Sequence, residues 1–201
     1  MSVVNTSPIS ENLNKYIPQI LLDIVEYLKE YTINISEDIE GEGRGGSLKD
    51  EGTVKNILLQ SKFKDYIFDE KARKFGDMIV LDYDGITRHP VNIKTTKGST
   101  DNSFSKAGIV YAFTNLSDTS KHLGPMNLKK MYNLIQEFSE DIPKKDYWYL
   151  CINKTNSSEI MIRGLKQINS WVVNINPSNI LQIDWKKEKL LLPAIRSYKD
   201  S

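Results

Sequence analysis

Two short apolar runs on either side of a turn-forming segment constrain this chain more than any other feature of its sequence. The first run is Met78–Leu81, and the second, at residues 91–96, is rich in β-branched side chains. An Asp-Tyr-Asp-Gly segment at residues 82–85 follows the first run. Such runs around a turn rich in aspartate and glycine are typical of a β-hairpin. The sequence therefore predicts two neighbouring strands within residues 75–105.

An acid and a lysine occupy corresponding places on the two predicted strands. Asp77 stands at the head of the first strand, and Lys94 lies in the second beside two threonines. This pairing suits phosphodiester hydrolysis, because a carboxylate can hold Mg²⁺ against the scissile phosphate while a lysine orients or deprotonates the attacking water. The alternative is that Asp77 caps a strand and Lys94 is a solvated edge residue.

The hairpin resembles the active-site hairpin of the PD-(D/E)xK nuclease superfamily. Within that superfamily it is most similar to orthodox type II restriction endonucleases of the EcoRV type, whose second strand carries an acid followed by Ile-Lys-Thr-Thr. Here the string at residues 92–96 is Asn-Ile-Lys-Thr-Thr. The resemblance maps the first acid of the family onto Asp77, its lysine onto Lys94 and its second acid onto Asn92. An asparagine offers a carbonyl oxygen that can ligate a hard cation but neutralises none of its charge.

The resemblance implies a restriction-endonuclease-like core, with a mixed central β-sheet flanked by helices. It implies a Mg²⁺-dependent type II endonuclease that hydrolyses phosphodiester bonds of double-stranded DNA at a short, palindromic site. A two-fold homodimer matches such a site and places one catalytic centre on each strand. Asp77 and Asn92 are the expected metal ligands and Lys94 the expected catalytic lysine.

Glu51 is a further candidate for the metal site and for catalysis. In the resembling nucleases a glutamate on the helix before the hairpin often reaches the metal, so Glu51 can supply the charge that Asn92 lacks. The alternative is that Glu51 only favours the positive end of a helix. Asp82 and Asp84 are expected to be carried away from Asp77 by the turn.

Two segments are candidates for DNA contacts. The first, residues 37–52, is rich in glycine and acids and is expected to be a loop from which Arg44 contacts a phosphate or a base edge. The second is the loop after Lys94, where short amides and hydroxyls can bond base edges and a lysine can hold a phosphate. Its candidate residues are Lys97, Ser99, Thr100, Asp101, Asn102 and Ser103. The alternative is that both segments are plain connections.

Composition narrows the chemistry and the organisation. A chain of 201 residues fits one domain, expected at 1–201 with a mobile arm at 1–14 and a basic tail at 186–201. The net charge of +1 gives no strong global field, so any DNA footprint must be local. One cysteine and two distant histidines exclude a multi-cysteine zinc site and a histidine-rich metal centre. No stretch reaches the ~18 apolar residues of a membrane span, and the N-terminus lacks signal-peptide features, so a cytoplasmic protein is expected.

Periodicity predicts the remaining elements of an α/β domain. Apolar residues at helical spacing predict a helix at 17–31, and a second helix is expected to run from residues 50–53 toward 63. The segment 108–113 is a short strand or the start of a helix, and 126–138 is a helix whose apolar stripe covers the sheet. Further strands are expected at 146–153, 159–162, 171–175 and 180–185.

Three other functions stay open from the sequence. A catalytically weak or inactive DNA-binding module with a nuclease fold is suggested by Asn92, and it predicts binding without cleavage. An RNA-directed or structure-selective nuclease would use the same hairpin on single strands or junctions. In a plain interaction protein, Lys94→Ala would leave every activity unchanged.

Overall fold

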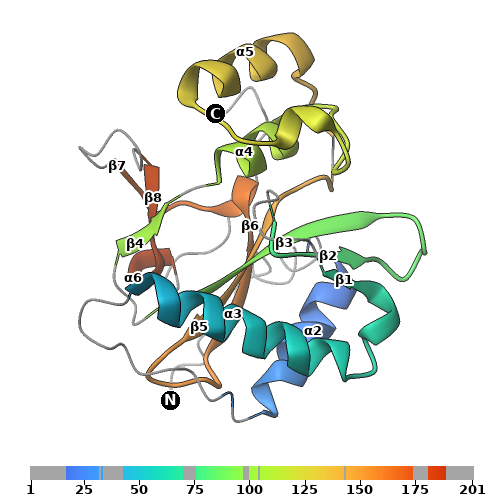
Figure 1. Ribbon diagram of the computed structural model, residues 1–201, viewed down its shortest axis with the longest axis vertical. Helices are drawn as coiled ribbons and strands as arrows, with labels where there is room; N and C mark the ends of the chain where they lie inside the picture. The colour runs from blue at the N-terminus through green and yellow to red at the C-terminus, as the bar shows by residue number, and fades with distance from the viewer. Residues whose placement is uncertain are drawn as a thin grey trace, which may run out of the picture.

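In the computed structural model of this chain, helices flank a five-stranded mixed sheet, and a separate three-stranded sheet lies beside it (Figure 1). The structure describes residues 17–31, 33, 43–69, 76–96, 100–103, 105–142, 144–173 and 181–188. The predicted α/β class with a mixed, helix-flanked sheet is confirmed. The predicted arm at 1–14 and the tail beyond residue 188 lie outside the described residues. Across the described part of the chain, no helix is long and apolar enough to cross a membrane.

The large sheet has the strand order β1-β2-β3-β5-β6. Its strands are β1 (Ile67–Asp69), β2 (Met78–Leu81), β3 (Arg88–Thr96), β5 (Trp148–Asn153) and β6 (Ile160–Gly164). Neighbours are antiparallel except β3 and β5, which are parallel. The predicted hairpin is confirmed as the β2–β3 pair, and Gly85 in its turn adopts a φ of 70°, which favours glycine. The three-residue strand β1 was not predicted.

Because β3 and β5 are parallel, the chain must cross over the sheet between them. The crossover includes β4 (Thr100–Ser103), α4 (Lys106–Phe113), the 3-10 turn η2 (Lys121–Leu123) and α5 (Leu128–Phe138). Helix α4 lies between the sheet and α5, and residues 107–113 are all buried, as expected of a helix covered on every side (Figure 1). The segment predicted as a strand or a helix start is therefore helical.

Helix α5 differs from its prediction in what it covers. It packs on α4 and lies away from the large sheet (Figure 1). Of the apolar stripe expected to pack on the sheet, Leu128 is 39% exposed and Tyr132 is 62% exposed. The helix itself is confirmed, but its stripe only partly enters the core because α4 already covers the sheet.

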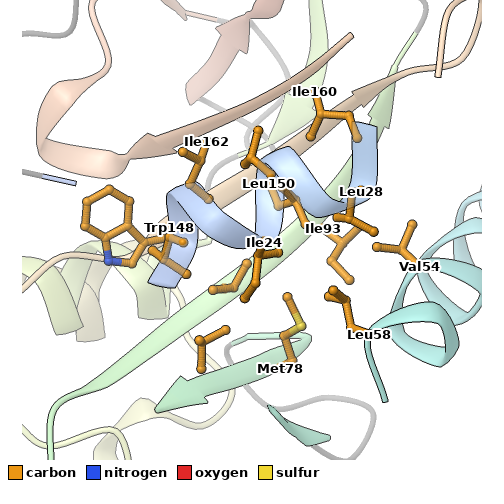
Figure 2. Close-up of a cluster of buried hydrophobic side chains, with 14 of the residues drawn as sticks. Ile24, Leu28, Val54, Leu58, Met78, Ile93, Trp148, Leu150, Ile160 and Ile162 are labelled. Atoms are coloured by element: carbon orange, nitrogen blue, oxygen red, sulfur yellow. The ribbon is translucent and has the colours of Figure 1, made fainter. Parts of the chain in front are cut away.

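The other face of the sheet is covered by α2 (Gln19–Lys29), the helix that the spacing of apolar residues predicted. Ile24 and Leu28 are one turn apart, so both point into the same core. Figure 2 shows them among the side chains of β2, β3 and β5, including Met78, Ile93 and Leu150. This core fixes the side of β3 that carries Ile93.

Helix α3 (Gly43–Leu59) packs beside α2 and begins earlier than expected. The described part of the predicted loop at 37–52, from residue 43 onward, is helical, so that prediction is wrong. The buried Asp50 explains part of the difference, because its carboxylate forms a 3.2 Å ion pair with Lys154 and accepts a 3.2 Å hydrogen bond from the Thr95 hydroxyl. These contacts tie α3 to the ends of β3 and β5, which local composition does not encode.

The small sheet has the order β4-β8-β7, with β7 (Trp171–Val173) and β8 (Leu181–Asp184) as predicted strands. Its third strand, β4, forms within the segment expected to be a polar loop. Helix α6 (Trp185–Glu188) follows β8, and two further 3-10 turns, η1 (Lys64–Tyr66) and η3 (Leu165–Gln167), complete the described elements. The predicted loop at residues 100–103 is therefore wrong, since these residues pair with β8.

Candidate active site

Strand β3 carries core residues on one face and the candidate site on the other. Val91 and Ile93 are buried in the core beneath α2 and α3. Asn92 and Lys94 point to the opposite face, because successive strand residues alternate. Their register partners on β5, Tyr149 and Cys151, belong to the core on the α4 side. Asn92 and Lys94 therefore lie on the α4 side of the sheet.

Asp77 contacts β3 on both sides of Asn92. Its N–H donates to the Val91 carbonyl at 2.9 Å, and its carboxylate Oδ2 accepts from the Ile93 N–H at 2.7 Å. Burial raises the pKa of Asp77, whereas the Lys94 charge, the Ile93 N–H and the Lys55 charge lower it. The structure thus brings Asp77, Asn92 and Lys94 together on the neighbouring strands that the sequence predicted.

Glu51 belongs to the same electrostatic neighbourhood. It lies in the middle of α3, so it does not sit at the start of a helix as one alternative required. Its carboxylate and that of Asp77 both act on the hydroxyl of Tyr147, the residue before β5. The two negative charges raise the Tyr147 pKa, although burial is the largest cause.

Tyr147 and Ser105 join the site without having been predicted. The Tyr147 hydroxyl forms hydrogen bonds with the side chains of Ser105 and Asn92. In the sequence Tyr147 is part of an apolar, aromatic run and Ser105 ends a polar segment, which gives no sign that they meet. The one usable signal is a tyrosine in a buried strand, since a buried hydroxyl needs a partner.

The side-chain carbonyl of Asn92 is the least satisfied atom of the site. Its Oδ1 is buried and has no hydrogen-bond partner among the described residues. An acceptor left in this state costs about 1–3 kcal/mol. Such an oxygen is suited to a cation, which would restore the missing interaction.

The residues present offer oxygen ligands, which suit a magnesium ion. Within the described ranges, no group of three or more His, Cys, Asp or Glu side chains is placed to hold a metal. Mg²⁺ needs fewer protein ligands, because it keeps several waters and takes one or two carboxylates together with substrate phosphates. Asp77 and the Asn92 carbonyl provide such oxygens, and the Glu51 charge adds to the field.

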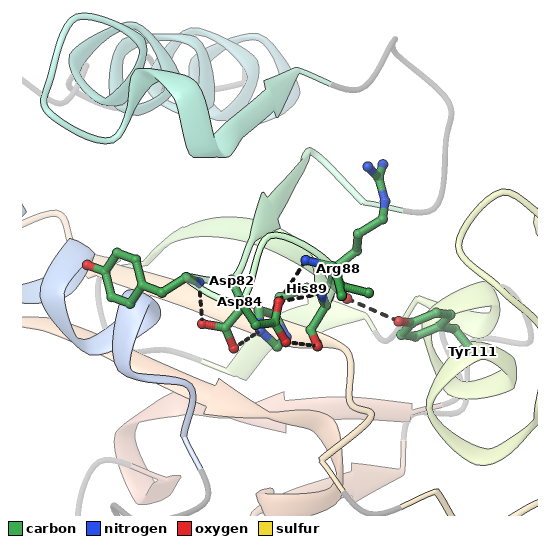
Figure 3. A network of polar contacts seen from close by, with 8 residues as sticks. Asp82, Asp84, Arg88, His89 and Tyr111 are labelled. Carbon is green, nitrogen blue, oxygen red and sulfur yellow. Dashed lines mark hydrogen bonds and ion pairs between the residues drawn. The ribbon is translucent and has the colours of Figure 1, made fainter.

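The turn carboxylates point elsewhere, as predicted. Figure 3 shows them at the tip of the hairpin, where Asp82 contacts His89 Nε2 at 3.1 Å. Asp84 accepts a 2.6 Å hydrogen bond from the Thr87 hydroxyl, and three such bonds lower its pKa to about 2. Both carboxylates therefore stabilise the turn.

The predicted DNA contacts fall largely beyond what the structure describes. Lys97 and Ser99 lie outside the described residues. Arg44 lies in α3 rather than in a loop, and only its backbone is described. The backbone of Thr100, Asp101, Asn102 and Ser103 forms β4, and their side chains likewise lie outside the described part.

Cys151 does not contribute a nucleophile. It lies buried beside Lys94 on the next strand, and burial raises the pKa of its thiol well above the ordinary value. Since the thiolate is the reactive form, the thiol is inert at neutral pH.

Comparisons with known proteins assign no family. No protein-family model matches the chain, and no curated protein sequence matches it. The function is therefore inferred from the site on β2, β3 and α3.

Proposed function

We propose that this chain is a Mg²⁺-dependent type II restriction endonuclease with a PD-(D/E)xK-type site. One observation carries the proposal. The Asp77 carboxylate accepts a hydrogen bond from the N–H of Ile93, which lies between Asn92 and Lys94 on β3. An acid, a carbonyl oxygen and an ammonium side by side on one sheet suit hydrolysis of a phosphodiester.

Each residue has a distinct role in this proposal. Asp77 and Asn92 hold the metal, and Glu51 supplies negative charge from α3. When bound, Mg²⁺ would neutralise phosphate charge and supply an activated water. Lys94 orients the attacking water and stabilises the negative charge that develops on the phosphate oxygens.

The hydrogen bond from Ile93 prepares Asp77 for its role. Fixing Oδ2 on a backbone N–H holds the carboxylate in one orientation before substrate arrives. Preorganised groups of this kind cost no rearrangement at the moment of reaction. The positive charges of Lys94 and Lys55 oppose the effect of burial and favour the ionised, metal-binding form.

The proposed substrate is double-stranded DNA with a short palindromic site, and the proposed assembly is a homodimer. Two-fold symmetry of the protein matches two-fold symmetry of the site and gives one centre for each strand. Sedimentation of the free protein and of its DNA complex tests this assembly. A complex holding a single protomer on a palindromic duplex contradicts it.

The deciding experiment is digestion of a long duplex of known sequence with the purified protein in Mg²⁺. We expect discrete fragments that disappear with EDTA. Lys94→Ala should lower the cleavage rate by roughly 10²–10³-fold, the range for loss of a group that stabilises developing negative charge. Lys55→Ala is the matched control, because its charge also reaches Asp77 while its ammonium pairs with Asp69 at 2.8 Å. This control should still cut at the same positions.

A DNA-binding module without cleavage is the second candidate, and Asn92 favours it. The site holds one carboxylate fewer than the resembling nucleases, so less cation charge is neutralised. This candidate predicts a retarded but uncut duplex in every divalent metal, with cleavage gained in Asn92→Asp. If duplex DNA is neither retarded nor cleaved, both candidates are excluded. Preferential cleavage of single strands or junctions would instead indicate that these are the substrate.

A further inference from the structure

The Asn92 side chain has two chemically different ends, and only one of them can ligate a cation. The carbonyl Oδ1 accepts and can coordinate a metal, whereas the Nδ2 amino group only donates. A rotation that exchanges the two ends would turn a metal ligand into a group that repels the metal. The proposed function therefore requires something to hold the amide in one orientation.

The contacts of Tyr147 identify that group. The Asn92 side chain is hydrogen-bonded to the Tyr147 hydroxyl, while Asn92 Oδ1 has no partner among the described residues. The bond must therefore be made by Nδ2, which donates to the Tyr147 oxygen. We propose that Tyr147 is a positioning residue, whose hydroxyl fixes the Asn92 amide so that Oδ1 rather than Nδ2 is presented to the metal.

Tyr147 is itself held firmly enough to do this. A methyl group built on Gly108 of α4 would lie 2.7 Å from the Tyr147 ring, so the ring rests directly on the helix backbone. The Tyr149 ring packs edge-on against it, with 5.3 Å between the centroids. Both ring contacts restrict the side chain, so the hydroxyl has little freedom to leave Asn92.

Ser105, at the start of α4, is a second contact of the Tyr147 hydroxyl. Ser105 caps this helix, because its Oγ accepts from the Gly108 N–H at 3.0 Å. The same side chain is hydrogen-bonded to the Tyr147 hydroxyl. A chain of contacts therefore runs from the N-terminus of α4 through Tyr147 to Asn92, and it connects the crossover helix with the proposed metal ligand.

The orientation can be tested without any variant. In the NMR spectrum of the metal-free protein, we expect nuclear Overhauser effects between the Nδ2 protons of Asn92 and the ring protons of Tyr147. The exchanged amide would place Oδ1 there and move the Nδ2 protons away. Assigned Nδ2 resonances without this effect would overturn the proposal, whatever the protein's activity.

The consequence for metal binding rests on the proposed function and is tested with Mn²⁺ as the probe. Binding to the DNA-free protein is followed by loss of the free-ion electron paramagnetic resonance signal. Tyr147→Phe removes only the hydroxyl and should weaken Mn²⁺ binding roughly tenfold, as loss of a residue that orients a metal ligand does. Tyr111→Phe is the matched control, because it removes a buried hydroxyl that donates to the Arg88 carbonyl at 3.3 Å and takes no part in these contacts. This control should bind Mn²⁺ like the wild type.

The Asn92→Asp background separates orientation from general damage to the site. A carboxylate has two equivalent oxygens, so it needs no hydroxyl to choose between them. Tyr147→Phe should therefore leave Mn²⁺ affinity within about twofold in Asn92→Asp, against the roughly tenfold loss expected for the Asn92 protein. Equal losses in the two backgrounds, or no loss in either, would overturn the role of Tyr147 alone. A wild type that binds no Mn²⁺ would overturn the proposed function and, with it, the ligand role of Asn92.

Discussion

Burial and the nearby positive charge of Lys94 act in opposite directions on the pKa of Asp77. Burial raises its pKa, and Lys94 is the largest influence that lowers it. A carboxylate must be deprotonated before it can bind a metal. Lys94 therefore has a second effect besides its proposed role in catalysis, because it favours the ionised form of Asp77 that the proposed metal would require.

Replacing Lys94 by methionine should raise the pKa of Asp77 further above its ordinary value. The change removes the charge but keeps an unbranched side chain of similar length. The measurement is an NMR titration of the ¹³C-labelled Asp77 carboxyl in the absence of metal. Lys129→Met on α5 is the control and should leave the titration unchanged, since that helix packs on α4 rather than on the sheet.

An unchanged or lowered Asp77 pKa in Lys94→Met would contradict the electrostatic account of the site. The pH dependence of Mn²⁺ binding gives a second check. Because protons compete with the metal for Asp77, the pH at which binding is half-maximal should move upward in Lys94→Met.

Among the residues of the site, the sequence predicted those that lie on the hairpin. Asp77, Asn92 and Lys94 come together because strand pairing and two-residue alternation place them, and both can be seen in the residue pattern. Tyr147 could not be predicted. Its hydroxyl meets Asn92 and Ser105 only after a parallel strand and a crossover helix are in place, and these are long-range events.

Within the helices, alanine in place of two different glycines should change the free energy of unfolding in opposite directions. A methyl group on Gly108 in α4 would lie 2.7 Å from the Tyr147 ring, whereas one on Gly52 in α3 would meet nothing within 4 Å. Gly108→Ala should destabilise the protein by about 1–3 kcal/mol through overpacking. Gly52→Ala should stabilise it by about 0.5–1 kcal/mol, because alanine loses less backbone entropy in a helix. Urea unfolding of both variants measures the difference.

The two glycine variants serve as controls for each other. Both exchanges add one methyl group to the interior of a helix, so a shared sign would contradict the packing described for α4. We also expect Gly108→Ala to disturb the Asn92–Tyr147 contact, which the same NMR spectrum reports.

At the scale of helices and strands, the predictions succeeded where the pattern was periodic. Helix α2 has a clear period of 3.6 residues, and the second half of β3 alternates with a period of two. The glycine-rich segment that begins α3 was wrongly predicted as a loop because composition cannot register the contacts of Asp50 with Thr95 and Lys154. Strand β4 was missed for a similar reason, since its partner β8 lies near the other end of the chain.

A buried carboxylate makes the stability of the folded protein depend on pH. Asp146 lies just before β5, where its Oδ1 accepts from the Tyr147 N–H at 2.8 Å and from the Lys166 N–H at 3.2 Å. Burial nevertheless raises its pKa from 3.8 to about 7. The folded protein therefore keeps a proton that the unfolded chain releases near pH 4.

The free energy of unfolding should fall as the pH rises from about 4 to about 7, because the unfolded chain binds fewer protons over that range. The contribution of Asp146 is fully present below the lower value and is lost through the higher one. The loss is up to about 4 kcal/mol for a shift of this size. Urea unfolding at several pH values measures the slope.

Asp146→Asn should make that slope shallower, whatever its effect on absolute stability. An amide keeps an acceptor for the two N–H groups but does not titrate. A variant with the wild-type slope would assign the pH dependence to other groups.

The overall class of the fold was predictable, whereas the packing between its layers was only partly so. Alternating helical and strand patterns indicated a mixed sheet with helices on its faces. They could not indicate that α4 would separate α5 from the sheet and leave Tyr132 exposed. Which helix reaches a sheet first depends on connection lengths and on side chains of other elements, such as Tyr147 beneath Gly108.

The division of β3 into a core face and a site face has an evolutionary consequence. Val91 and Ile93 hold the strand in the core, while Asn92 and Lys94 play little part in that packing. Substitutions at the second pair can therefore accumulate in descendants without a loss of stability that selection would remove. The proposed cleavage could therefore be lost through one substitution on this face while the fold is kept.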